Sequence, residues 1–122
     1  MQPQLNRTYL ASLAQTDAAL RNWGVWARRD GVPRVVMPYE GDWLACNDLE
    51  AELTEQALLV VKARRLLWWR LIQREYLFNW ARASMVLWWR DVRGTGEGSF
   101  RVARLQMLEF VTRRLEKNTQ KY

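Results

Sequence analysis

Arginine residues gather around a glycine-rich segment near the C-terminus, and their side chains are suited to binding phosphate oxygens and base edges. A guanidinium presents its N–H donors in a planar fork that matches phosphate or the edge of guanine. Sixteen of the nineteen basic residues in the 122-residue chain are Arg. A serine in the same segment can cap a helix and contact phosphate. The residues that we expect to contact double-stranded DNA are Arg82, Arg90, Arg93, Ser99, Arg101 and Arg104.

The charge of the chain is divided between its two halves. Residues 62–122 carry eleven Arg and three Lys against five carboxylates, a net charge of +9. Residues 1–61 carry five Arg against eight carboxylates, a net charge of −3. Positive charge concentrated in this way favours a polyanion as partner. A solvated, Arg-rich surface that only confers solubility is the alternative.

Carboxylates also cluster in the middle of the chain, where they could hold Mg²⁺ for nuclease chemistry. The members of this cluster are Asp42, Asp48, Glu50, Glu52 and Glu55. The spacing of Asn47 and Glu50 favours a helix N-terminus instead, because it fits a capping box and acidic residues stabilise a first turn. We prefer the helix interpretation and keep a metal-dependent nuclease as an alternative.

The sequence contains no His and a single Cys, Cys46. An internal disulfide is therefore excluded, and so is a structural zinc site built from four Cys and His ligands. The commonest general base near neutral pH is missing as well. We expect a protein that is not an enzyme and that uses no metal or cofactor.

Hydrophobic periodicity predicts an all-α fold. Leu5 to Arg29 is typical of a helix, which could break near Thr16 because a Thr-Asp pair can cap a second helix. Residues 30–47 contain several Gly and Pro residues and are expected to form a long irregular linker. Residues 1–47 are thus an N-terminal helical segment with its linker, and residues 48–122 are the DNA-binding region of one compact unit.

The chain from residue 48 onward is predicted to consist of successive helices. The first runs from Asp48 to at least Ala63, and its apolar stripe consists of Leu49, Leu53, Ala57 and Val60. A second helical segment continues through Leu77. Asn79 then interrupts the chain before a helix over residues 80–92.

A glycine-rich turn and a last helix complete the prediction. Gly94–Gly98 is expected to be a loop, with Ser99 as N-cap of a helix over residues 100–117. The packed face of that helix consists of Phe100, Ala103, Met107, Phe110 and Val111. This is the layout of a helix-turn-helix, in which the first residues of the final helix reach base edges in the major groove. An αα-hairpin that binds no nucleic acid has the same layout.

Eight Trp residues are an unusually high number for this length. Four of them form the adjacent pairs Trp68-Trp69 and Trp88-Trp89. Adjacent residues on a helix point about 100° apart, so one member of each pair should be buried and the other partly exposed. We expect these rings to fill the core, with exposed members serving a protein interface rather than stacking on single-stranded nucleic acid.

Several segments within residues 17–115 are similar to one known family. Asn22–Arg29 resembles the aromatic-Gly-aromatic segment near the N-terminus of the bacteriophage late antitermination proteins named Q, in their small, zinc-free form. Asn47-Asp48, the helices over residues 48–77 and Tyr76–Asn79 resemble the part of the family that leads into a sigma-region-4-like helix-turn-helix. The apolar residues of its two helices are matched by Met85, Val86, Met107, Phe110 and Val111.

The resemblance implies a transcription antitermination factor of a bacteriophage. Such a factor binds double-stranded DNA in the late promoter region and joins bacterial RNA polymerase, held with its sigma factor at a promoter-proximal pause. The polymerase then reads through terminators. This chain departs from the family pattern at Asn79, where Gly is frequent, at Arg104, where an apolar residue is expected, and in a longer Gly94–Gly98 turn.

The nearest alternative to antitermination is a helix-turn-helix repressor or activator, which would usually bind a palindromic site as a dimer. No stretch is long and apolar enough for a membrane span, and Met1–Asn6 lacks the features of a secretory signal. We therefore expect no membrane contact and a cytoplasmic location in a bacterial host cell.

Overall fold

The fold was analysed in a computed structural model, which describes residues 7–31 and 47–120. Helices account for nearly all of these residues, and no strand occurs among them, so the predicted all-α fold is confirmed. The elements are α1 (Arg7–Trp26), the π-helical turn η1 (Ala27–Gly31), α2 (Asp48–Arg64), α3 (Leu66–Ile72), the π-helical turn η3 (Gln73–Leu77), α4 (Arg82–Arg93) and α5 (Glu97–Gln120). Most of the predicted linker, with Asp42 and Cys46, lies outside the described residues.

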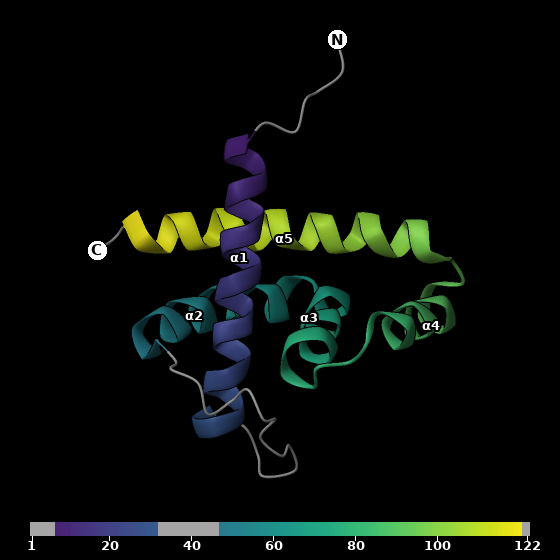
Figure 1. Cartoon of the computed structure of the whole chain (residues 1–122), viewed down its shortest axis with the longest axis horizontal. Coiled ribbons are helices and arrows are strands. Elements are labelled where there is room, and N and C mark those ends of the chain that lie inside the picture. Colours follow the sequence, from purple (N-terminus) through teal and green to yellow (C-terminus); the bar gives the residue numbers. More distant parts are fainter. Residues whose placement is uncertain (1–6, 32–46, 121–122) are drawn as a thin grey trace.

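The N-terminal helix runs across the helices of the basic half. Figure 1 shows α1 crossing both α5 and α2, and it also contacts η3. The α4 helix lies beside the N-terminal end of α5, at the far end of the molecule from the start of α2. No described helix is long and apolar enough to cross a membrane.

The core is built from one side of each α-helix. Its members include Leu20, Trp23, Leu58, Val61, Leu71, Ile72, Tyr76, Met85, Trp89, Phe100, Met107 and Val111. Four of the five residues predicted for the packed face of the last helix are buried, and Phe110 packs partly buried against them. Burial of this apolar surface is the main favourable contribution to folding.

Two sequence predictions for the first helices are wrong. The α1 helix is not broken near Thr16, because that residue is buried within it and its hydroxyl lies 2.6 Å from the hydroxyl of Thr112 on α5. The predicted stripe of α2 is wrong at its first position, since Leu49 is 68% exposed, although Ala57 is buried as predicted. The buried residues of α2 are Ala51, Thr54, Ala57, Leu58 and Val61.

Small side chains explain the register of α2. Ala51 and Thr54 are fully buried where α1 and α2 cross, and the Thr54 hydroxyl donates to the carbonyl of Glu50 at 2.8 Å. A threonine whose hydroxyl bonds to its own helix can be buried without an unsatisfied polar group. The buried side of α2 thus combines small residues with Leu58 and Val61, and a pattern of large apolar residues does not identify the small ones.

The start of α2 is fixed by an asparagine from α1. Asn47 is the N-cap, as predicted, and its Oδ1 accepts from the Glu50 N–H at 2.9 Å. The Asn47 N–H donates to Oδ1 of Asn22 at 2.9 Å, and Nδ2 of Asn22 donates to the Asn47 carbonyl at 2.9 Å. An asparagine side chain thus satisfies one donor and one acceptor of the same cap residue.

The next two residues of α1 bind other elements. The indole N–H of the buried Trp23 donates to the Glu55 carboxylate of α2. A Cβ added to Gly24 would lie 2.1 Å from the carbonyl oxygen of Tyr76 in η3. Arg28, one turn later, donates to the carbonyls of Tyr76 at 2.8 Å and Leu77 at 3.0 Å. The tryptophan segment singled out in the sequence therefore holds α1 against two neighbouring elements.

Left-handed backbone conformations mark both ends of α4. Asn79, before the helix, has a φ of 55°, a value that Asn tolerates better than most residues. Gly94 caps the C-terminus with a φ of 70°, and its N–H donates to the Arg90 carbonyl at 2.7 Å. The interruption at Asn79 was predicted, and α4 lies close to the range expected for it.

The connection between α4 and α5 is shorter than the predicted Gly94–Gly98 loop. The α5 helix begins at Glu97, so Gly98 and Ser99 belong to its first turn. Only residues 94–96 join the two helices. The expected N-cap role of Ser99 is therefore wrong. The predicted bounds of the turn, Gly94–Gly98, are wrong as well.

The paired tryptophans follow the prediction in one case. Trp89 is 3% exposed and Trp88 is partly exposed, as expected for adjacent residues on a helix. Trp68 and Trp69 are both partly buried, because Trp69 packs edge-on against Trp23 of α1 and Trp68 packs edge-on against Phe110 of α5. Two different neighbours thus give both rings a packing surface.

We predict that Gly24→Ala lowers the free energy of unfolding by about 2–3 kcal/mol, because the new methyl group collides with the Tyr76 backbone. Gly98→Ala is the control: nothing lies within 4 Å of the added carbon, and the residue is in a helix. It should raise the free energy of unfolding by up to about 1 kcal/mol. Urea unfolding of the variants measures both, and equal effects would contradict the close contact.

Candidate nucleic-acid interface

The unit formed by α4 and α5 is held at its turn by a tryptophan. The indole N–H of Trp89 lies 3.2 Å from the hydroxyl of Thr95 and 3.2 Å from that of Ser99, and the two hydroxyls are 2.9 Å apart. The Trp89 ring also packs edge-on against Phe100, the first fully buried residue of α5. Ser99 therefore serves to fix the turn, and its hydroxyl already has two partners.

The N-terminal half of α5 separates two surface hollows. Residues three or four positions apart lie on the same side of a helix. Glu97, Arg101, Arg104 and Leu108 follow that spacing on one flank, where with Arg82 and Leu105 they line the first hollow. Ser99, Val102, Ala103 and Gln106 lie on the other flank and line the second hollow together with residues of α3 and α4.

Arg101 is the most accessible of the predicted contacts on α5. Its side chain is 71% exposed and donates from Nη2 to Oε1 of Glu97 at 3.0 Å. An exposed ion pair between residues i and i+4 is worth only about 0.3–0.5 kcal/mol. Exchanging this carboxylate for a phosphate or a guanine edge would therefore cost little.

Arg82 lies on the same flank, at the first turn of α4. Its guanidinium is 5.2 Å from the centre of the Phe100 ring. The N-cap residue, Ala81, makes no side-chain hydrogen bond, and the first turn of α4 holds no acidic residue. Free backbone N–H groups and the helix dipole thus add to the positive charge of the side chain at this point.

Arg90 and Arg93 lie in the last turn of α4, and both are exposed. Arg93 lines the second hollow, with Ser99. The structure therefore brings Arg82, Arg101 and Arg104 to one flank of α5 and places Arg93 on the other.

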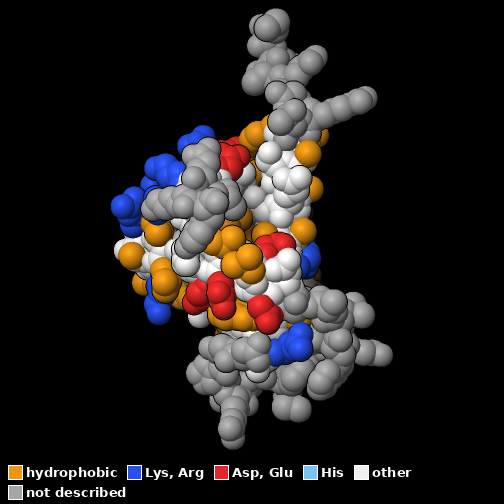
Figure 2. Space-filling view, turned by 90° about the vertical axis from the view of Figure 1, so that its left-hand side faces the viewer, with side chains coloured by type: hydrophobic (Ala, Val, Ile, Leu, Met, Phe, Trp, Pro, Cys, Tyr) orange, Lys and Arg blue, Asp and Glu red, His pale blue; other side chains and the backbone are white. Residues whose placement is uncertain are grey.

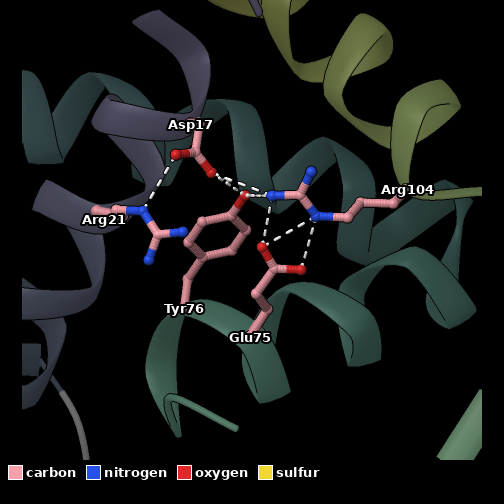
Figure 3. Close-up of polar contacts among 5 residues, drawn as sticks. All are labelled: Asp17, Arg21, Glu75, Tyr76 and Arg104. Carbon is pink, nitrogen blue, oxygen red and sulfur yellow. Dashed lines mark hydrogen bonds and ion pairs between the residues drawn. The ribbon is translucent and has the colours of Figure 1, made fainter. Parts of the chain in front are cut away.

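Arg104 is occupied by an internal network, which Figure 3 shows in close-up. Its Nε and Nη2 donate to both oxygens of Glu75, the closest at 2.6 Å. Nη2 also contacts Asp17 Oδ1 at 3.2 Å and the Tyr76 hydroxyl at 3.0 Å. The Tyr76 hydroxyl in turn donates to Asp17 Oδ1 at 2.6 Å. The network joins α5 to η3 and to α1.

These contacts remove Arg104 from the set of residues available to DNA. Its side chain is 19% exposed and that of Glu75 is 11% exposed. Separating a largely desolvated, bidentate pair leaves a carboxylate without compensation, which costs several kcal/mol. The position at which the Q-like pattern expects an apolar residue is thus filled by an arginine that binds the protein itself.

The network shifts the pKa of its members in opposite directions. Burial raises the pKa of the Tyr76 hydroxyl well above its usual range. The hydrogen bonds to Glu75 raise the pKa of Arg104. For Asp17, burial raises the pKa, but the hydrogen bond from Tyr76 and the charges of Arg21 and Arg104 outweigh it, so the pKa lies below the usual value of 3.8.

Cations are exposed along the basic half of the described chain, and the sequence prediction covered only some of them. The exposed members after residue 61 are Lys62, Arg64, Arg65, Arg70, Arg82, Arg90, Arg93, Arg101, Arg113 and Lys117. Of those not predicted as contacts, Arg65 lines the second hollow with Arg93.

Exposed carboxylates gather where α2 begins. Figure 2 shows the side on which α2 begins, where acidic side chains gather. Asp48, Glu50 and Glu52 are exposed at the start of α2, and Glu55 binds the Trp23 indole. In the described part of the chain, no three His, Cys, Asp or Glu side chains come close enough to hold a metal ion. Basic side chains appear in the same view, so the charge division of the sequence is only in part a division in space.

Comparison of the chain with protein-family models, with curated proteins and with solved structures gives no match. The similarity to the Q proteins therefore rests on the motifs of the sequence. The case for DNA binding rests on those motifs and on the geometry of α4 and α5.

We predict that Arg104→Ala lowers the free energy of unfolding by about 3 kcal/mol, because it leaves the Glu75 carboxylate buried without its partner. Arg101→Ala, in the same helix, should lower it by less than about 0.5 kcal/mol. Chemical denaturation compares the two variants. A small effect at Arg104, similar to that at Arg101, would mean that the network does not hold α5 in place.

A pH dependence of stability follows from Asp17. Because its folded pKa is below its unfolded value, its contribution to stability is complete above the usual value of 3.8 and is lost as the pH falls through the lower, folded value. Asp17→Asn should therefore reduce the drop in unfolding free energy between neutral pH and acid. Denaturation curves at a series of pH values test this, and an unchanged pH profile in Asp17→Asn would contradict it.

Proposed function

We propose that this protein binds double-stranded DNA through α4 and the N-terminal half of α5 and acts as a phage transcription antitermination factor. The observation that carries DNA binding is the position of three exposed arginines around α5. Arg82 and Arg101 lie on one flank of this helix and Arg93 lies beyond the other. Arginines on both sides of one helix suit the two phosphate walls of a groove.

The exposed edge of α5 between these arginines is compatible with entry into the major groove. Gly98, Val102 and Leu105 lie along it, and all three are exposed. A major groove about 12 Å wide admits an α-helix, and the first turns of a recognition helix contact base edges there. Apolar side chains such as Val102 could contact a thymine methyl group.

The predicted contacts have different roles in this proposal. Arg101, in the second turn of α5, reads a base edge, because its exchangeable partner Glu97 is the only charge that it must leave. Arg82, Arg90 and Arg93 bind phosphates and fix the register of the helix. Arg104 and Ser99 bind other residues of the protein and hold α5 and the turn in position.

Antitermination is supported by the resemblance of residues 17–115 to the Q proteins. On that basis the DNA-bound protein meets bacterial RNA polymerase and its sigma factor at a pause near the late promoter. Transfer of the protein to the paused polymerase then allows read-through of terminators. The factor acts without catalysis, cofactor or metal.

For DNA binding, we predict a loss of affinity by on the order of tenfold or more between ~50 and ~200 mM salt, since each phosphate contact releases counterions. Arg101→Ala should cost about 1–3 kcal/mol at the preferred site and relax its sequence preference, whereas Arg93→Ala should weaken all sequences alike. Arg113→Ala, an exposed arginine in the other half of α5, is the matched control.

These measurements use fluorescence anisotropy with a duplex selected from a random library and with an unrelated duplex. A salt-independent affinity, or an Arg101→Ala protein that binds both duplexes like the parent, would show that α5 does not read DNA. An equal loss in Arg113→Ala would show only general charge attraction.

For antitermination, we predict that the purified protein raises read-through of a terminator only when the template carries the cognate late promoter and its pause. The same terminator behind an unrelated promoter should respond little, because the protein must first find its DNA site. In vitro transcription with the matching polymerase and sigma factor measures this. Tight promoter binding with unchanged termination would replace antitermination by repression or activation.

A further inference from the structure

The second hollow, on the flank of α5 away from Arg82 and Arg101, is a separate surface feature. It lies between the start of α3, the end of α4 and the first half of α5. Its lining includes Arg65, Leu66, Trp68, Arg93, Val102 and Gln106. We call this hollow the α3–α5 cleft.

The floor of the α3–α5 cleft is apolar, and its apolar residues remain open to solvent. Leu66 is 53% exposed and Val102 is 56% exposed. Trp68 is partly exposed at the same place and packs edge-on against Phe110 at 5.6 Å between ring centres. Exposed large apolar residues that line one hollow together are more informative than the same residues scattered singly over a surface.

The rim of the cleft is positive. Arg65 lies with its guanidinium 5.0 Å from the centre of the Trp68 ring, which holds the charge over the apolar floor. Arg93 contributes a second cation from the last turn of α4. No carboxylate is among the described residues that line the cleft, and Gln106 adds an amide that can bond to a peptide backbone.

We propose that the α3–α5 cleft is a docking site for an acidic amphipathic segment of a partner protein. Apolar side chains of that segment would cover Leu66, Trp68 and Val102, and its carboxylates would pair with Arg65 and Arg93. Tryptophan and arginine are the residues that dominate binding energy at protein interfaces. The cleft shares Arg93 and Val102 with the proposed DNA surface, whereas Arg65, Leu66 and Trp68 belong to the cleft alone.

A second nucleic-acid site fits the cleft less well. Interfaces with DNA are more polar and more positively charged than interfaces between proteins, whereas most residues that line this cleft are apolar. A phosphate backbone would satisfy the arginines but would leave Leu66 and Val102 without an apolar partner. An acidic amphipathic segment would offer apolar side chains to Leu66 and Val102 and carboxylates to the two arginines.

The test is fluorescence anisotropy with a labelled helical probe peptide that carries Leu and Phe on one face and Asp and Glu beside them. The comparison probe has Lys in place of every Asp and Glu. The acidic peptide should bind at least about tenfold more tightly than the basic one. Equal binding of the two peptides, or no binding of the acidic one, would overturn the proposal.

Matched variants locate the site. Leu66→Glu should weaken acidic-peptide binding by about tenfold or more, as expected for an interface anchor. Leu87→Glu should not, since Leu87 is 59% exposed on α4 and does not line the cleft. Likewise Arg65→Glu should weaken binding more than Arg70→Glu, because Arg70 is exposed but lies outside the cleft. Equal losses within either pair would contradict the assignment.

Two further readouts separate this proposal from folding defects and from DNA binding. In the unmodified protein, the acidic peptide should shift the indole N–H signal of Trp68 and leave that of the buried Trp23 in place. Leu66→Glu should lower affinity for the peptide but not for a DNA duplex. If it lowers both equally, the cleft belongs to the DNA surface and the docking proposal fails while DNA binding stands.

Discussion

The bidentate pair between Arg104 and Glu75 is the interaction on which the arrangement of this molecule depends. It ties the first half of α5 to η3, and through Asp17 and the Tyr76 hydroxyl it ties both to α1. The same π-helical turn is held from its other side, where Gly24 approaches the Tyr76 carbonyl and Arg28 donates to it. A polar network at the crossing of three elements has few alternative geometries, because each unpaired member would carry a desolvation penalty.

This constraint divides the basic residues into two kinds. Arg28 and Arg104 donate hydrogen bonds to backbone and carboxylate oxygens of the fold. Arg82, Arg93 and Arg101 instead extend from α4 and the start of α5 into solvent. Exposed carboxylates gather where α2 begins, at the end of the molecule opposite α4. The fold thus presents a rigid helix with cations on both flanks, and a separate apolar cleft beside it.

The sequence predicted the helices better than the contacts among them. Periodicity and turn residues located every described helix, including the interruption at Asn79, because these signals are local. The register of α2 could not be predicted in this way, because the burial of Ala51 and Thr54 depends on where α1 crosses. Net charge could not distinguish Arg104 from Arg101 either. The distinction arises from Glu75, which lies 29 residues from Arg104 along the chain, and single-sequence patterns do not report such pairings. The one usable signal was an arginine at a helix position expected to be apolar.

Mapping of a selected DNA duplex onto the protein by NMR tests the central claim most directly. The duplex is obtained by selection from a random library, and the amide and arginine side-chain signals of the labelled protein are followed during titration. If α5 reads DNA, the largest shifts should fall at residues 97–105, with shifts of the Arg82 and Arg93 side chains and little change at α2. Shifts centred on α1 and α2, or a selection that enriches no sequence, would contradict recognition of DNA by α5.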